Sequence, residues 1–154
     1  MKLGKLLDFD VVVIDHAPTL STEPDMLIDE PNYDLSKFDF RRSDSVIVLT
    51  KGTRDVDILR KLSDVNVRFV GLLASRKRVA EDLRLLREQG VREEFISSLH
   101  APVGIDIGAI TPMEIALSIM ADVITVKHGK HGPHKTLQGE MLGKTVAVES
   151  KASS

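Results

Sequence analysis

The sequence predicts an α/β protein built on a parallel sheet with helices on both faces. Apolar, β-branched runs at residues 9–15, 45–50 and 68–74 lack the alternation of a half-exposed strand. Such runs are typical of strands that are buried on both sides in a parallel sheet. Segments with apolar residues at helical spacing follow the second and third runs, at 55–63 and 76–89. Strands that alternate with helices favour a parallel sheet joined by right-handed crossovers.

Composition excludes several classes of protein. The 154 residues suffice for one domain with a sizeable core. A net charge of −2 gives no electrostatic footprint for nucleic acid, and the absence of cysteine removes disulfides, thiolate metal sites and cysteine nucleophiles. No apolar run approaches the roughly 18 residues of a membrane span, and the first residues do not resemble a signal peptide. We therefore expect a cytoplasmic protein that binds neither nucleic acid nor membranes.

The first third of the chain contains one regular strand between less regular segments. Residues 2–8 resemble the last turns of a helix, and the strand at 9–15 follows them directly. The segment 16–45 is rich in Asp, Pro, Ser and Glu, with a short strand expected at 26–28 and a turn at 32–34. Two interpretations of this segment stay open, an ordered lid and a loosely held connection.

Local signals fix the ends of the later helices. Ser75 is a suitable N-cap for the helix at 76–89, and Gly90 is a suitable residue to end it. A short helical piece is expected at 91–99.

The stretch at 99–120 divides into an irregular loop and a helix start. Pro102, Gly104 and Gly108 interrupt its first half, which predicts a loop that brings backbone close to another group. Thr111 as N-cap, with Glu114 three residues later, forms a capping box in sequence. The apolar run that follows predicts a largely buried helix.

Four segments are expected on the ligand side of the sheet, because ligands of parallel α/β sheets bind beyond the carboxyl ends of the strands. They are Asp15-His16, Thr50 to Gly52, Ser75-Arg76 and the loop from His100 to Gly108. An acidic residue that closes a buried strand, such as Asp15, can accept hydrogen bonds from ribose hydroxyls. A solvated loop aspartate is the competing interpretation of this position.

Beyond residue 127 the composition changes to a tail rich in Gly, His and Lys. The domain is therefore expected to span 1–127 and the tail 128–154, with a short strand at 145–148. Histidines at 128, 131 and 134 suggest a metal site, but the glycine and proline between them do not preorganise ligands. No metal site and no catalytic residue are predicted.

Three motifs together carry a resemblance to a known family. They are Val70-Gly-Leu-Leu-Ala-Ser-Arg-Lys-Arg78, Leu99-His-Ala-Pro-Val-Gly-Ile-Asp-Ile-Gly-Ala109 and Thr111-Pro-Met-Glu-Ile-Ala-Leu-Ser-Ile119. The chain, from about residue 3 to Lys127, resembles the C-terminal Rossmann-like domain of the XdhC/CoxI family of xanthine dehydrogenase accessory proteins. The resemblance is strongest over 69–127.

The resemblance implies an accessory role rather than catalysis. Family members are expected to bind molybdenum cofactor, protect it during sulfuration and pass it to a molybdenum hydroxylase apo-enzyme, with a cysteine desulfurase as a further partner. Arg76 and the adjacent helix start would hold phosphate, and His100 would donate to an oxo or phosphate oxygen or transfer a proton. The candidate cofactor-binding residues, from strand ends and motifs, are Asp15, Thr50, Ser75, Arg76, His100, Gly104, Asp106 and Gly108.

The sequence departs from the family pattern in three ways. It contains no G-x-G-x-x-G, so the first β-α unit of the Rossmann-like sheet is expected to be missing. We then expect exposed strand edges that pair with a partner chain or a second copy, or poor stability. The small N-terminal domain of the family, which carries a cysteine implicated in cofactor handling, is also expected to be missing. Lys51-Gly52 stands where the family tends to place a histidine.

Two other functions stay open. The strand ending in Asp15 favours an NAD(P)-dependent oxidoreductase, although no phosphate-binding glycine turn is present. The missing first unit favours a non-catalytic assembly subunit that binds only a protein partner.

Overall fold

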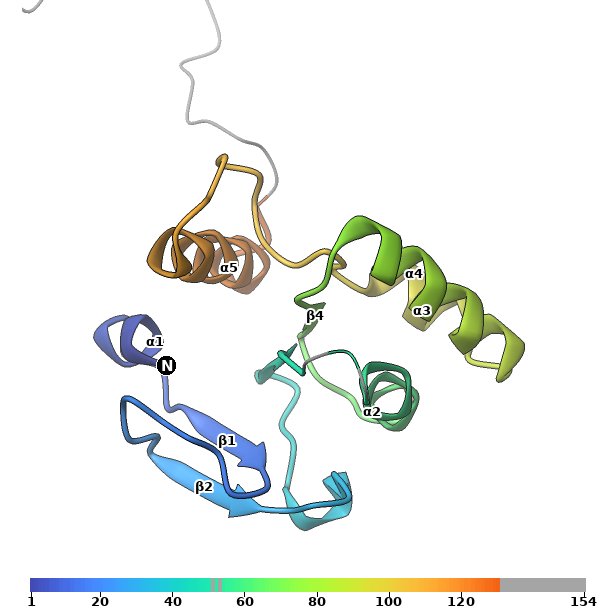
Figure 1. Ribbon diagram of the computed structural model, residues 1–154, viewed down its shortest axis with the longest axis horizontal. Helices are drawn as coiled ribbons and strands as arrows, with labels where there is room; N and C mark the ends of the chain where they lie inside the picture. The colour runs from blue at the N-terminus through green and yellow to red at the C-terminus, as the bar shows by residue number, and fades with distance from the viewer. Residues whose placement is uncertain (51, 53, 131–154) are drawn as a thin grey trace, which may run out of the picture.

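The computed structural model describes residues 1–50, 52 and 54–130 (Figure 1). Its order of helices and strands agrees with the α/β prediction, and each element expected before residue 128 is present. The predicted tail strand at 145–148 lies outside the described residues. The elements are α1 (Lys2–Leu6), β1 (Val12–Asp15), β2 (Met26–Asp29), the 3-10 helix η1 (Leu35–Lys37), β3 (Ser45–Val48), α2 (Asp55–Leu62), β4 (Phe69–Leu72), α3 (Arg76–Glu88), α4 (Glu93–Ser98) and α5 (Pro112–Lys127).

The strands form two parallel pairs. β1 pairs with β2, from Val12 opposite Met26 to Asp15 opposite Asp29. β3 pairs with β4, and a single parallel bridge joins β4 to His100. Across residues 1–50, 52 and 54–130, no ladder connects one pair to the other, so β1, β2 and β3 each keep one edge without a strand partner.

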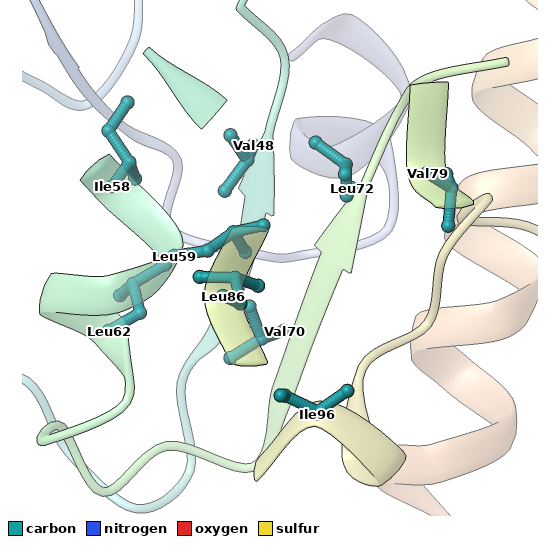
Figure 2. Packing of buried hydrophobic residues seen from close by; sticks show 9 residues of the cluster. All are labelled: Val48, Ile58, Leu59, Leu62, Val70, Leu72, Val79, Leu86 and Ile96. Carbon is teal, nitrogen blue, oxygen red and sulfur yellow. The ribbon is translucent and has the colours of Figure 1, made fainter. Parts of the chain in front are cut away.

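Helices cover both faces of the β3–β4 pair. Alternate residues of a strand point to opposite faces, and Val70 and Leu72 pack with α2, α3 and α4 while Phe69 packs with α5. Fully burying each large aliphatic side chain contributes about 1.5–3 kcal/mol. Figure 2 shows the larger cluster, which consists of Val48, Ile58, Leu59, Leu62, Val70, Leu72, Val79, Leu86 and Ile96. The prediction of helices on both faces of a parallel sheet is confirmed here.

Two expectations of burial are wrong. All four residues of β1 are only half-buried, although the sequence predicts a strand buried on both sides, because none of them belongs to either of the two hydrophobic clusters in the described residues. Helix α5 is not largely buried either: Met113 and Leu117 are 59% and 52% exposed. This helix packs on one face only, and its buried residues are Ser118, Ile119, Asp122 and Val123.

The segment between β1 and β3 is an ordered connection held against the core. Tyr33, Leu35 and Phe40 pack against the larger hydrophobic cluster. Asp34 caps η1 by accepting a hydrogen bond from the Ser36 amide at 3.1 Å. Of the two interpretations, a loosely held connection is therefore wrong.

Side-chain caps fix the two helices that flank the loop at 99–110. Ser75 Oγ accepts the Arg78 amide at 3.3 Å at the start of α3. Thr111 and Glu114 form the complete capping box at the start of α5, as predicted. None of the helices in the described part of the chain combines the length and apolarity needed to cross a membrane.

Candidate functional site

His100 lies beside β4 as if it extended the strand pair. Its amide donates to the Val70 carbonyl, and its carbonyl accepts the Leu72 amide, both at 3.0 Å. Gly71 leaves room for Val103 of the same loop, since a Cβ at position 71 would lie 2.5 Å from Val103 Cγ2. The backbone of the predicted loop is therefore anchored to the sheet at its first residues.

The side chain of His100 is paired with a buried carboxylate. His100 Nδ1 lies 2.9 Å from Asp122 Oδ1 and 3.1 Å from Oδ2, and the Gly104 amide donates to Oδ2 at 3.0 Å. Asp122 is 8% exposed, whereas the His100 side chain is 35% exposed. Because an ionised carboxylate only accepts hydrogen bonds, it selects the tautomer with the proton on Nδ1. Nε2 of His100 is then the nitrogen that can accept a hydrogen bond or a proton.

Gly104 holds the loop against helix α5. Its φ is +112°, and a Cβ at this position would lie 2.4 Å from Ser118 Oγ. Ser118 Oγ donates to the Ile105 carbonyl at 2.5 Å, and the Ile105 amide donates to the Ser118 carbonyl at 3.2 Å. Both the backbone conformation and the contact with Ser118 require glycine here.

Asp106 and Gly108 lie on the exposed part of the loop. Asp106 Oδ1 accepts the Gly108 amide at 3.3 Å, which is a local turn within the loop. Gly108 has φ +69°, and a Cβ there would meet no atom within 4 Å. This part of the backbone is open on its outer side.

The other candidates lie just after the ends of β3 and β4. Thr50 Oγ1 donates to Asp55 and accepts the Gly52 amide at 3.2 Å, so this hydroxyl is engaged in fixing the turn into α2. Ser75 is engaged as the cap of α3. Arg76 is exposed at the first position of that helix and forms no ion pair within the described residues.

Asp15 ends β1, as predicted, but its carboxylate already has partners. Oδ1 accepts the Tyr33 hydroxyl at 2.9 Å and the His16 amide at 2.8 Å. Burial, together with this hydrogen bond to Asp15, raises the pKa of Tyr33 above its usual value of 10.0. The pair links the end of β1 to the following connection, which is a structural role that the sequence did not indicate.

The structure brings together only part of the predicted set. His100 and Gly104 meet at Asp122, whereas Asp106 and Gly108 bond to each other on the loop surface. Asp122 is absent from the predicted set, although it is the single charged residue in the apolar stretch 115–126. Within residues 1–50, 52 and 54–130, no three His, Asp or Glu side chains form a group that could hold a metal ion.

Comparison with known proteins gives three relatives of different lengths. The chain is 46% identical over 91 residues to the Escherichia coli protein YqeB, covering 59% of this chain and 17% of that protein. It is 35% identical over 126 residues to a Bacillus subtilis protein named as a probable subunit of xanthine dehydrogenase. This match covers 77% of this chain and 36% of that protein. A crystal structure of a xanthine dehydrogenase from Bacillus halodurans superposes with a TM-score of 0.69 at 30% identity, covering 84% of this chain and 39% of that one.

These relatives share a domain with this chain and are longer than it is. The chain spans between 17% and 39% of their lengths. The model of the XdhC Rossmann domain family matches residues 1–123, which include the strands, the loop at 99–110 and most of α5. The chain therefore belongs to the XdhC Rossmann domain family.

Proposed function

We propose that this domain binds molybdenum cofactor, or a related pterin or nucleotide, and assists its insertion into a molybdenum hydroxylase such as xanthine dehydrogenase. Membership of the family and the names of two relatives support a role in that system. One observation carries the proposal for this chain. A buried carboxylate, Asp122, holds a partly exposed histidine, His100, on a loop anchored to the strand end.

The chemistry of the loop suits an oxygen-rich ligand. His100 Nε2 is free to accept a hydrogen bond when neutral and to donate one when protonated. With Nδ1 hydrogen-bonded to Asp122, a proton carried on Nε2 of His100 can be donated to a phosphate or oxo group. The exposed backbone at Gly108 allows close approach, and the guanidinium of Arg76 is a suitable partner for phosphate.

The proposed partners follow from this role. A domain that handles cofactor must meet the apo-hydroxylase, and a cysteine desulfurase when the cofactor is sulfurated. We place these encounters in the cytoplasm.

The test is retention of cofactor during purification. The chain is produced in cells that make molybdenum cofactor, purified, denatured, and assayed for a fluorescent pterin oxidation product. We expect pterin in the wild type and a loss of about tenfold or more in His100→Ala, because hydrogen bonds to charged groups contribute about 1.5–3 kcal/mol. His128→Ala is the matched control, since His128 is exposed just after α5. Absence of pterin, together with no thermal stabilisation by added cofactor, would refute the proposal.

The two alternatives make different predictions. An NAD(P)-dependent oxidoreductase requires saturable binding of NAD(H) in calorimetry that Asp15→Ala abolishes. The hydrogen bonds that Asp15 already accepts from Tyr33 and His16 weigh against it. A protein-binding assembly factor predicts full activation of the hydroxylase after both His100→Ala and Arg76→Ala.

A further inference from the structure

A second candidate site lies between helices α2 and α3, apart from the loop that carries His100. A cleft of about 540 Å³ opens there. The start of α2 forms one wall, the length of α3 forms the other, and Gly52 lies at its end. Asp55, Arg78 and Asp82 line it, and the proposed function uses none of them.

Two buried carboxylates line this cleft, and one of them lacks a complete set of partners. Asp55 is 2% exposed and accepts the Thr50 hydroxyl. Asp82 is 3% exposed, and its Oδ2 has no hydrogen-bond partner within the described residues. Its Oδ1 lies 3.6 Å from Arg78 Nε, which is too long for a hydrogen bond. A buried carboxylate oxygen without a donor is costly, so Asp82 indicates a donor that a ligand would supply.

Arg78 places a cation beside this carboxylate. Its guanidinium lies against Gly52, where a Cβ would be 2.2 Å from Arg78 Nη2. The side chain is 40% exposed, so it can donate to a group in the cleft. Another acid of the α2 wall, Asp57, is already paired with Lys61 at 2.9 Å, which leaves Asp82 as the unsatisfied acceptor.

A carboxylate acceptor beside a guanidinium donor is complementary to a ligand that presents the matching donors and acceptor along one edge. A carboxylate pairs with two adjacent N–H groups, and a neighbouring guanidinium pairs with a carbonyl oxygen. The 2-amino-4-oxopyrimidine ring of pterins and of guanine presents this set: a ring N–H, an exocyclic amino group and a carbonyl. A metal ion is a poorer match, because no group of three ligand side chains exists in the described part of the chain.

We propose that Asp82 and Arg78 bind the 2-amino-4-oxopyrimidine edge of a pterin or a guanine nucleotide in the α2–α3 cleft. The pterin form of this proposal rests on the proposed function, in which the ligand is a pterin cofactor. The guanine form does not depend on it.

The experiment is calorimetry of the full chain with paired ligands. Pterin-6-carboxylate is compared with lumazine-6-carboxylate, in which an oxo group replaces the 2-amino group, and GMP is compared with IMP, which lacks that group. We expect the amino compound of at least one pair to bind about tenfold or more tightly than its partner, because a hydrogen bond to a charged group contributes about 1.5–3 kcal/mol.

Substitutions then assign the binding to the cleft. Asp82→Asn should weaken the amino compound about tenfold or more, because an amide offers one acceptor oxygen where the carboxylate offers two. Glu88→Gln is the matched control, since Glu88 is exposed on the same helix but does not line the cleft, and it should leave binding unchanged. Arg78→Gln provides a second variant if Asp82→Asn alters folding, and it should weaken binding as well.

The outcomes separate this inference from the proposed function. Equal binding of the paired ligands, or binding that Asp82→Asn and Arg78→Gln leave intact, overturns the inference. Pterin binding that responds only to His100→Ala also overturns it, while the proposed function stands. Binding of GMP without pterin-6-carboxylate supports the guanine form of the inference, and the co-purification assay then decides the proposed function. Binding of neither GMP nor pterin-6-carboxylate overturns the inference, and the co-purification assay decides the proposed function independently.

Discussion

The pairing of His100 with Asp122 joins a loop side chain to a helix 22 residues away in sequence. One carboxylate accepts from the His100 ring and from the Gly104 amide, so a single residue orients the side chain and fixes the loop backbone. Such a partner acts by positioning, because it fixes the tautomer and leaves the other ring nitrogen for a ligand.

At this scale Asp122→Asn should destabilise the protein by about 1–3 kcal/mol, because the amide has one acceptor oxygen for two partly buried donors. Urea denaturation followed by circular dichroism measures the loss. Asp39→Asn is the control, since Asp39 is exposed. A free energy of unfolding equal to that of the wild type would show that the carboxylate is not needed to hold the loop.

Substitution of Asp82 should change stability in the opposite direction to Asp122→Asn, and the change should depend on pH. Burial, and then the charge of Asp55, raise the pKa of Asp82 above its usual value of 3.8. Since the folded-state pKa exceeds the unfolded one, the stabilising contribution is present at low pH and lost as pH rises through the folded-state value. Asp82→Asn should therefore raise the melting temperature at pH 7, and this gain should vanish below the unfolded pKa.

Thermal melts across this pH range provide the measurement, with Asp64→Asn as an exposed control on the same protein. A gain that is equal at acid and neutral pH would contradict the assignment. A residue that weakens the free protein while it offers an unsatisfied acceptor to a ligand is typical of a binding site.

At the scale of elements, the loop at 99–110 and helix α5 form one unit. Backbone hydrogen bonds tie the start of the loop to β4, and Ser118 and Asp122 tie its middle to α5. The capping box at Thr111 fixes where the helix begins. Within this unit, the exposed turn at Asp106 is the part that is least tied to β4 and α5.

Two glycines of the loop should therefore differ in their tolerance of alanine. Gly104→Ala combines a positive φ with a clash at Ser118, and each such strain costs about 1–3 kcal/mol. Gly108→Ala has the positive φ but open space around its Cβ, so its cost should be the smaller of the two. Chemical denaturation of both variants makes the comparison. Equal losses would contradict the packing described for Gly104.

Local signals explain which parts of the fold were predictable. Strands appear as β-branched runs and helix starts as caps, so their positions follow from neighbouring residues, as at Ser75 and Thr111. Burial depends on what packs against an element from elsewhere in the chain. For that reason the half-exposed state of β1 and the exposed face of α5 were not predictable.

The same distinction applies to the candidate sites. Motif residues gave His100 and Gly104, because a loop with glycines beside a histidine is visible in sequence. Asp122 was missed, since a charged residue in an apolar helix gives no indication of which loop it faces. Asp82 was missed as well, because an acid on a charged helix gives no sign of its burial.

At the scale of the whole molecule, the described strands form two parallel pairs that no ladder joins. Free strand edges are sites of association between chains. We propose that they allow the isolated chain to pair with a second copy or with a partner chain. Because β1 is half-buried and β4 is fully buried, we expect the β1–β2 pair to be less stable than the β3–β4 pair.

Hydrogen exchange of the isolated chain tests this contrast. At low protein concentration, amides of β1 should be protected about tenfold or more weakly than those of β4, because local opening is easier where burial is low. Protection of β1 should rise with protein concentration if a second copy covers its edge. Equal protection of both strands at low concentration would contradict this account.

The packing at Gly71 should constrain which residues can occur together at positions 71 and 103 among homologues. A side chain at 71 would collide with Val103 and with the ring of Phe69. Residue 71 can therefore vary only together with a smaller neighbour, and covariation between 71 and 103 is expected among homologues. In a double-mutant cycle, Gly71→Ala with Val103→Ala should cost less than the sum of the two single changes, and strict additivity would show that the strand and the loop vary independently.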